Sequence, residues 1–247
     1  MMKKIKKIRG NLILLLLAVV AFLACSRDDY YTDGGRAEAI FDGSIMEYLD
    51  AKPREFDTIA QIVRLAGLED RFRSDEFTFF APHDADIKEL IGSYTEGGLN
   101  RSLYELMLDT IVTLADVDPE IWAFYLQRHM FRGKNLLADY PQIDLNLRSV
   151  YGGQNYYSLG DAVCNIGVEF QDAVSSDGSS RLQYMGYRQL GIGYIRDLSK
   201  PTEYGRINVS SSDIQPRNGV VHVLDYRDGE FGFSNNQVIV DIIESKR

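Results

Sequence analysis

The sequence predicts an α+β fold behind an N-terminal export segment. In the first half of the chain apolar residues recur at helical spacing, whereas from about residue 140 apolar and polar residues alternate with a period of two. A helical half followed by a strand-rich half favours α+β over alternating strands and helices. The sequence contains no internal repeat, and the roughly 220 residues behind the export segment are enough to form one hydrophobic core.

Residues 1–24 have the pattern of a lipoprotein signal peptide. A basic stretch from Lys3 to Arg9 precedes the apolar run Leu12–Ala24, which is shorter than the about 20 residues that a membrane-spanning helix needs. Leu23-Ala24-Cys25 resembles a bacterial lipobox, with Phe22 where leucine is usual. We therefore expect cleavage before Cys25 and attachment of palmitate-type acyl chains to it. A retained hydrophobic anchor is the alternative.

Residues 25–43 are predicted to be an acidic tether. Asp28 and Asp29 lie directly behind Cys25, and in some Gram-negative lineages such a stretch marks export to the cell surface. We expect a lipid-anchored protein of the outer membrane that faces the cell exterior, with a periplasm-facing orientation left open.

Charge and cysteine content exclude some roles. Removing residues 1–24 leaves 22 basic and 36 acidic residues, a net charge of −14, and an acidic body repels phosphate backbones, so no nucleic-acid partner is expected. The membrane contact should be the lipid anchor alone. Once Cys25 is acylated only Cys164 remains, which excludes an intrachain disulfide. Cys164 falls on the apolar face of an alternating segment, so we expect an inert core thiol.

The individual elements follow in chain order. Phe77–Ala81 has the aromatic content of a buried strand that Pro82 ends, and Asp84 is placed to cap a helix that runs to Ile91. The other predicted helices begin near Ser44 and cover Thr58–Leu68, Arg101–Leu114 and Pro119–Phe131. The other predicted strands are Ile143–Leu147, Tyr156–Leu159, Cys164–Phe170, Leu182–Arg188, Gly193–Arg196, Ile207–Val209 and Val220–Tyr226.

Two segments about 130 residues apart carry a family resemblance. FTFFAPHDADI, from Phe77 to Ile87, and NGVVHVLD, from Asn218 to Asp225, resemble the signature segments of the fasciclin (FAS1) domain family. The matching positions, including one between the two segments, are Thr78, Phe80, Ala81, Pro82, Asp84, His129, Asn218, Gly219, His222 and Asp225. The departures are Phe79, His83 and Asp86. With its lipobox, the chain resembles a bacterial lipoprotein member of this family.

The resemblance implies a wedge over residues 44–230, formed by a β-sandwich with helices packed along one side. The long span from His129 to Asn218 implies a strand-rich insertion at about 160–200. Residues 231–247 are left as a C-terminal extension with a strand-like stretch, Val238–Ile243. Arg128-His129 stands where animal members have a tyrosine–histidine pair associated with integrin contact, so that activity is not carried over.

No sequence motif points to catalysis. The chain lacks Gly-x-Ser-x-Gly, a P-loop, GxGxxG and zinc-ligand spacing, and its three histidines all fall in the motif regions, where we expect structural roles. We predict no catalytic residues, no metal and no cofactor. Scattered acids leave a carboxylate pair open.

Tyrosine and arginine in and around the insertion are the candidate binding residues, because both are frequent anchors of binding surfaces. They are Tyr156, Tyr157, Tyr184, Tyr187, Arg188 and Tyr194. The alternative is that tyrosine simply favours strands.

The sequence thus favours a non-catalytic, surface-anchored lipoprotein whose FAS1-like domain mediates adhesion or ligand binding, to an extracellular protein or a glycan. An accessory subunit of an outer-membrane glycan-uptake complex and an enzyme acting on envelope polysaccharide are the alternatives.

Overall fold

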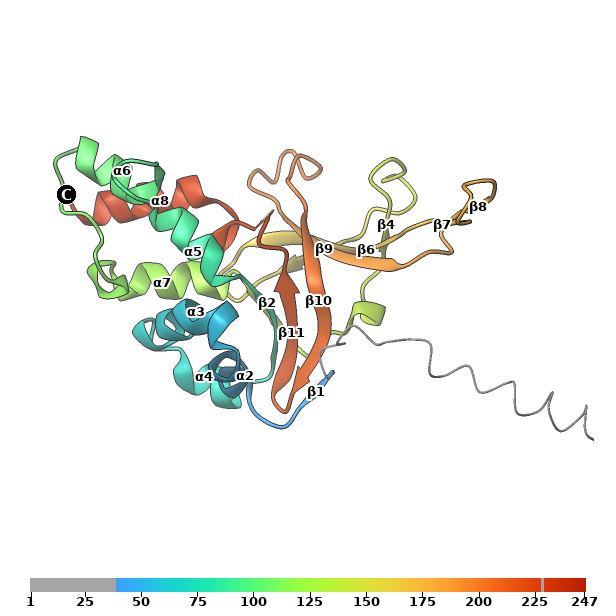
Figure 1. Cartoon of the computed structure of the whole chain (residues 1–247), viewed down its shortest axis with the longest axis horizontal. Coiled ribbons are helices and arrows are strands. Elements are labelled where there is room, and N and C mark those ends of the chain that lie inside the picture. The colour runs from blue at the N-terminus through green and yellow to red at the C-terminus, as the bar shows by residue number, and fades with distance from the viewer. Residues whose placement is uncertain (1–38, 228) are drawn as a thin grey trace, which may run out of the picture. The chain divides into compact units, whose positions relative to one another are not determined.

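The computed structural model describes residues 39–227 and 229–247, and it confirms the predicted α+β class (Figure 1). The predicted signal peptide, the lipidation site Cys25 and most of the predicted tether lie outside the described residues. Among the residues that are described, no helix is long and apolar enough to cross a bilayer.

The described part of the chain contains seven α-helices, most of them before the main run of strands. They are α2 (Ile45–Ala51), α3 (Pro53–Leu65), α4 (Glu69–Ser74), α5 (Asp84–Ile91), α6 (Gly98–Glu105), α7 (Pro119–Gln127) and α8 (Asn235–Ser245), with short 3₁₀ turns η2 (Leu114–Asp116), η3 (Leu137–Asp139) and η4 (Phe231–Phe233). The strands are β1 (Ile40–Phe41), β2 (Phe77–Ala81), β3 (Met130–Arg132), β4 (Gln142–Ile143), β5 (Gln154–Tyr157), β6 (Val163–Phe170), β7 (Ala173–Val174), β8 (Arg181–Leu182), β9 (Arg188–Tyr194), β10 (Ile207–Pro216) and β11 (Gly219–Leu224).

One large sheet runs in the order β3-β2-β11-β10-β9-β6-β4, with β1 added to β10 and β5 to β6. Its central pair is β2 and β11, which are parallel and in register from Phe77 opposite Gly219 to Ala81 opposite Val223. The two segments that resemble family signatures are therefore hydrogen-bonded neighbours. The small hairpin β7–β8 forms a separate two-stranded sheet.

The central strands serve two hydrophobic clusters because successive side chains of a strand point to opposite faces. Phe79 of β2 and Val221 of β11 pack into a large cluster with the helices. Phe80 and Leu224, on the other face, pack into a second cluster with Ile166 of β6. The sheet therefore curls, so that its β6–β9 part covers the face that the helices leave open. In Figure 1 the helices lie on one side of β2 and β11, and β6 and β9 extend on the other.

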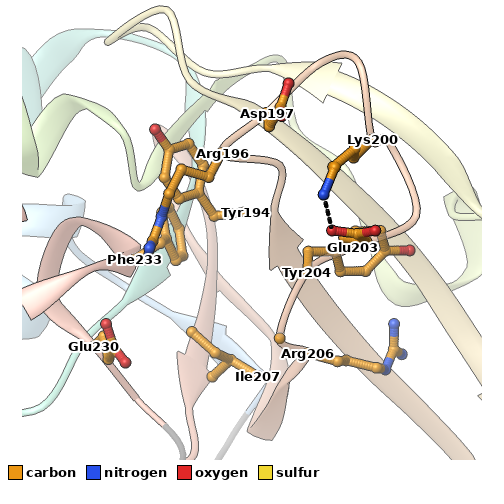
Figure 2. Close-up of a pocket in the computed structure, with 11 residues that line it drawn as sticks. Tyr194, Arg196, Asp197, Lys200, Glu203, Tyr204, Arg206, Ile207, Glu230 and Phe233 are labelled. Atoms are coloured by element: carbon orange, nitrogen blue, oxygen red, sulfur yellow. Dashed lines mark hydrogen bonds and ion pairs between the residues drawn. The ribbon is translucent and has the colours of Figure 1, made fainter.

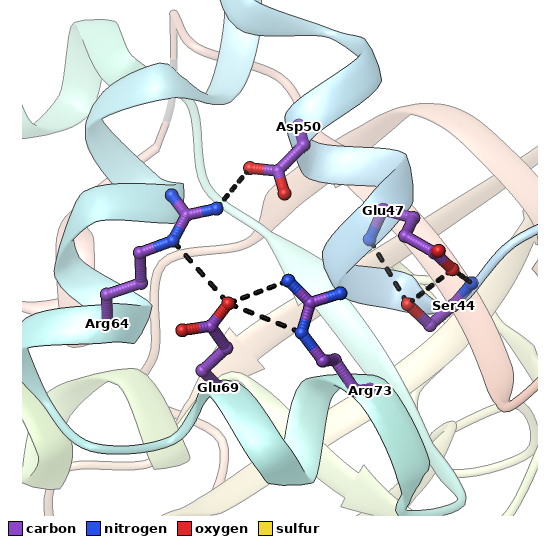
Figure 3. Close-up of polar contacts among 6 residues, drawn as sticks. All are labelled: Ser44, Glu47, Asp50, Arg64, Glu69 and Arg73. Carbon is purple, nitrogen blue, oxygen red and sulfur yellow. Dashed lines mark hydrogen bonds and ion pairs between the residues drawn. The ribbon is translucent and has the colours of Figure 1, made fainter.

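Polar contacts tie the first three helices together (Figure 3). Ser44 and Glu47 form a reciprocal capping box at the start of α2. Arg64 on α3 lies 2.6 Å from Asp50 and 3.7 Å from Glu69, and Glu69 also pairs with Arg73 at 2.7 Å. These side chains are 36–43% exposed, so each pair contributes at most about 1 kcal/mol and chiefly orients α2, α3 and α4.

Several predicted boundaries were wrong. The prediction for Arg101–Leu114 overshoots, because α6 ends at Glu105 and Met107 adopts a left-handed conformation with φ of 57°. Helix α3 begins at Pro53, five residues before the predicted start, and Pro suits a first helical turn. Leu182–Arg188 is not a continuous strand, since Tyr184 has φ of 59°. The predicted tether ends inside the fold, because β1 pairs with β10.

The tail was the largest error. Val238–Ile243, predicted to be strand-like, lies within helix α8. Its β-branched composition suggested a strand, but Val238 and Ile242 are four residues apart and both are fully buried on one helical face. Tertiary packing against α7, α6 and η4 overrides the local preference for extended structure.

The C-terminal segment is part of the main core. Phe231 is fully buried, with ring centroids 5.6 Å from Trp122 and 5.7 Å from His129. The Nε2 atom of His129 accepts a hydrogen bond of 2.8 Å from the backbone N–H of Gly232. Arg128 is only 5% exposed and donates to the carbonyl oxygen of Gly232. Arg128 and His129 are therefore covered by the tail rather than displayed to a partner.

Replacing Phe231 by alanine should lower the free energy of unfolding by about 3–5 kcal/mol, because the cavity would open between Trp122 and His129. Chemical denaturation followed by circular dichroism measures this. The matched control is Val240→Ala on α8, whose side chain is 51% exposed and whose loss should cost less than about 0.5 kcal/mol. Equal small effects of both changes would contradict a core role for the tail.

Candidate functional site

The predicted binding residues do not form one surface. Tyr156, Cys164 and Tyr194 are opposite one another on β5, β6 and β9, so the two tyrosines share a row of the sheet and pack against the second cluster. Tyr157, next on β5, is 70% exposed. Tyr187 and Arg188 lie at the other end of β9. The structure therefore divides the set between the two ends of this strand.

The group near the β7–β8 hairpin is partly used by the fold itself. The hydroxyl of Tyr184 donates to Asp144 at 2.7 Å, and its backbone N–H donates to Asp172 at 2.8 Å. The guanidinium of Arg188 lies 3.6 Å from the centre of the Phe170 ring and donates to the carbonyl of Tyr184. Tyr187, by contrast, is 67% exposed.

A cleft of about 500 Å³ lies beside Tyr194, and we take it as the candidate ligand site because it brings Tyr194, Tyr204 and Phe233 together with charged side chains. Figure 2 shows Tyr194, Arg196 and Phe233 on one side of it, and Lys200, Glu203 and Tyr204 on the other. Its remaining lining residues include Asp197, Arg206, Ile207 and Glu230. Of the residues predicted from sequence, only Tyr194 belongs to it.

Two glycines of β9 make room for the cleft wall. A Cβ atom on Gly193 would lie 2.1 Å from the Tyr204 ring, and one on Gly191 would lie 2.5 Å from the Arg206 guanidinium carbon. The two side chains can therefore lie flat across the strand. The Gly-Ile-Gly sequence within a strand was the signal that sequence reasoning missed, because glycine in a strand often marks such a close approach.

The aromatic walls are rigidly supported. The rings of Tyr194 and Phe233 are stacked at 6.1 Å, and Phe233 stacks in turn on His129 at 4.3 Å. The Arg128 guanidinium lies 5.1 Å from the Tyr194 ring on this wall. On the opposite wall the Arg148 guanidinium lies 4.9 Å from the Tyr204 ring.

Each carboxylate of the cleft already accepts a hydrogen bond or forms an ion pair within the protein. Glu203 pairs with Lys200 at 3.1 Å, and Glu230 accepts the backbone N–H of Asn235 at 2.9 Å. Asp197 accepts from the hydroxyl and backbone N–H of Ser199, which lowers the pKa of Asp197. Arg196 donates to the hydroxyl of Ser234 at 2.8 Å.

His129 and His222 are buried and have structural roles. His222 is fully buried, with Nδ1 accepting from the N–H of Asp213 at 3.2 Å and Nε2 2.9 Å from the carbonyl of Asn135. Burial lowers the pKa of His222 to about 4 and that of His129 to about 3, so both are neutral at physiological pH. Cys164 is buried as well, and burial raises the pKa of its thiol, which disfavours the reactive thiolate.

The other signature residues join distant segments. The Asn218 amide accepts from the N–H of Ile45 at 2.8 Å and donates to the carbonyls of Phe72 and Asp75. Thr78 donates to the carbonyl of Gly133 at 2.7 Å. Ala81 and Pro82 are buried, and Gly219 packs on the carbonyl of Phe77. Asp225 pairs with Arg227 at 2.5 Å.

The predicted cap at Asp84 was wrong. His83 is the N-cap residue of α5, and the carboxylate of Asp86 accepts its backbone N–H at 2.7 Å. Asp84 instead accepts the backbone N–H of Ile59 at 3.0 Å and so ties α5 to α3. Asp86 is the third residue of the helix, from which a carboxylate can reach back to the N-cap, whereas Asp84 is the first.

The described residues contain no group of three or more His, Cys, Asp or Glu side chains that could hold a metal ion.

No family model and no curated protein matches the sequence. Among solved structures the chain is similar to a FAS1 domain pair from the insect cell adhesion molecule fasciclin I, with a TM-score of 0.46 and 19% sequence identity. The match covers 74% of this chain and 50% of that one, so the chain spans about half the length of that structure.

The buried Asp86 generates a prediction for pH dependence. Its Oδ1 has no hydrogen-bond partner among the described residues, and burial, with help from Glu89 and Asp225, raises its pKa to about 7. The folded protein therefore holds a proton here that the unfolded chain loses near pH 4, and the stability from this group falls as pH rises from about 4 to about 7.

Replacing Asp86 by asparagine should remove that pH dependence, because the amide carries no proton to lose. At pH 8 the variant should be more stable than the parent by roughly 2–4 kcal/mol, at about 1.4 kcal/mol for each pKa unit, and near pH 4 the two should be alike. Denaturation at a series of pH values measures this. The exposed Asp109→Asn is the control, and parallel curves for D86N and parent would contradict the assignment.

Proposed function

We propose that the chain is a non-catalytic, lipid-anchored binding domain of the FAS1 type, and that it binds glycan in the cleft between Tyr194 and Tyr204. The observation that supports this most is the pair of braced aromatic walls around a cleft of about 500 Å³. That volume falls within the usual range for small-ligand sites, roughly 300–1,000 Å³.

The chemistry of the walls suits a sugar. A sugar ring has apolar C–H faces, which pack on aromatic rings, and a rim of hydroxyl groups, which exchange hydrogen bonds with charged side chains. Tyr194 and Tyr204 supply the rings, and Arg196 and Glu203 supply a donor and an acceptor. Because stacking already holds Tyr194 and Phe233 in place, little side-chain freedom is lost on binding.

Replacing Tyr204 by serine should weaken binding at least tenfold, about 1.4 kcal/mol, because it removes one aromatic wall. Titration of the full chain with a panel of extracellular polysaccharide fragments measures this. Tyr157→Ser is the matched control, because that tyrosine is exposed and lies outside the cleft. Unchanged affinity in the Tyr204 variant would place the glycan elsewhere.

Attachment through Cys25 is the second part of the proposal, and it rests on the lipobox-like Leu23-Ala24-Cys25. Feeding cells an alkyne-labelled palmitate should label the parent chain and not Cys25→Ser, whereas Cys164→Ser should be labelled like the parent because that thiol is buried. Accessibility of the labelled protein to protease added to intact cells distinguishes the proposed exterior facing from a periplasmic one. Labelling of Cys25→Ser would contradict the lipid anchor.

The carboxylates of the cleft favour one alternative, an enzyme that cleaves envelope polysaccharide. Asp197, Glu203 and Glu230 line the same cleft, and glycoside hydrolysis uses two carboxyl groups. A general acid needs a raised pKa, whereas that of Asp197 is lowered. Turnover of any panel member that Glu203→Gln abolishes would replace the binding proposal.

The β7–β8 hairpin favours the other alternative, an accessory subunit of an outer-membrane glycan-uptake complex. Val174, Leu182, Met185 and Tyr187 are 58–68% exposed on and beside this hairpin, which projects from the sheet in Figure 1. A stoichiometric transporter in a pull-down from solubilised membranes, lost with Leu182→Ser, would support that role.

A further inference from the structure

We infer that the cleft selects an acidic glycan, in which a sugar carboxylate binds to Arg196. This rests on the proposed function and adds the chemical class of the ligand. The cleft contains three cations, Arg196, Lys200 and Arg206, and three carboxylates, so it is formally neutral on a body of net charge −14, and an anionic sugar has to be attracted locally by one of these cations. Which cation does so depends on which of these groups still have unused hydrogen-bonding capacity.

The carboxylates are engaged. Glu203 is paired with Lys200, and Asp197 accepts two hydrogen bonds from Ser199. Glu230 accepts the first backbone N–H of α8, where the positive end of the helix dipole favours a negative charge. Each carboxylate keeps lone pairs for a neutral sugar hydroxyl, but these internal donors already stabilise its negative charge.

Arg206 is largely committed as well, and its Nε, which has no hydrogen-bond partner among the described residues, is buried. Its guanidinium lies across β9 and β6 and donates to the carbonyls of Gly167 at 2.8 Å, Gln189 at 3.3 Å and Gly191 at 3.4 Å. Figure 2 shows it directed away from Arg196. It stiffens the wall below Tyr204 rather than offering a free fork of donors.

Arg196 differs from both groups. Its side chain is exposed, and in the described part of the chain its one recorded partner is the neutral hydroxyl of Ser234, bound through Nη2. Within the described residues no carboxylate lies within 4.0 Å of it. A guanidinium has five N–H donors in a planar fork that matches the two oxygens of a carboxylate, and such charge-assisted pairs are stronger than neutral ones.

The position of Arg196 suits this role. Ser234, its partner, is the N-cap residue of α8 and is almost completely buried, so one edge of the guanidinium is fixed by the folded core. Figure 2 places the arginine beside the Tyr194–Phe233 wall. A sugar that packs against the accessible part of Tyr194 would therefore carry its carboxylate to the free edge of the guanidinium.

The experiment uses the full chain and a panel of acidic polysaccharide fragments, namely galacturonan, alginate, hyaluronan and glucuronoxylan. Each is tested in its native form and after carboxyl reduction, which leaves the sugar but removes the charge, together with neutral glucan and galactan. Affinity is measured by titration calorimetry at 50 mM and 500 mM salt. We expect the tightest ligand to be acidic, at least tenfold weaker after reduction, and weakened by salt.

Arg196→Gln should abolish the difference between the native and reduced forms, because glutamine retains a donor for Ser234 but carries no charge. Arg196→Lys should keep part of the preference, since a lysine charge lacks the planar fork. The control is Arg54→Gln on the exposed side of α3. Melting temperatures of all three variants should match that of the parent.

The outcomes separate the two proposals. If a neutral glycan, or a reduced form equal to its native form, binds best and Tyr204→Ser weakens it, the acidic preference is wrong and the glycan-binding function stands. If the native forms bind best but Arg196→Gln keeps the preference, the carboxylate contact is assigned to the wrong residue. If neither acidic nor neutral members bind, both proposals fail.

Discussion

The parallel pairing of β2 with β11 is the constraint on which the rest of the structure depends. It joins segments about 140 residues apart, and it is close enough that a Cβ at Gly219 would lie 2.2 Å from the carbonyl oxygen of Phe77. The pair is buried on both faces, as parallel strands usually are. Side chains on one face pack against the helices, and side chains on the other face pack against β6 and β9. Side chains from these two strands therefore contribute to both hydrophobic clusters.

Buried polar groups connect this central pair to the cleft. His129 is hydrogen-bonded to both β2 and the C-terminal segment. Its Nδ1 lies 2.9 Å from the carbonyl oxygen of Phe80, and its Nε2 accepts the backbone N–H of Gly232 at 2.8 Å. Phe233, one residue beyond, stacks on the same imidazole and forms a wall of the cleft. The position of this wall of the cleft is therefore fixed by contacts with the buried core. A buried imidazole can do this only in its neutral form, which its lowered pKa ensures.

Local patterns predicted some features well and others poorly. Strand Phe77–Ala81 and the end of α5 at Ile91 were placed correctly, and the start of α5 was wrong by one residue, because an aromatic run and a proline break are strong local signals. The alternation around Cys164 likewise placed that thiol in a core. The tail failed, since Val238 and Ile242 fit a strand by composition and a helix by spacing, and only α7 and η4 decide between them. The candidate site was mostly missed because Tyr194, Tyr204 and Phe233 come from three segments whose proximity no local pattern encodes.

The sequence by itself determined the α+β class, the order of helical and strand-rich halves, the acidic charge of the body and the signature segments at its centre. These features depend on residue periodicity, on composition and on short motifs. They can be recognised without knowing which distant segments meet in the fold. Only the tertiary structure decided that the C-terminal segment is core, that Arg128 and His129 are covered, and which charged groups of the cleft remain unused. Those properties depend on burial and on hydrogen bonds between residues far apart in the chain, such as Arg128 and Gln237, which are 109 positions apart. Contacts of this kind depend on how distant segments pack together, and no single stretch of residues determines that packing.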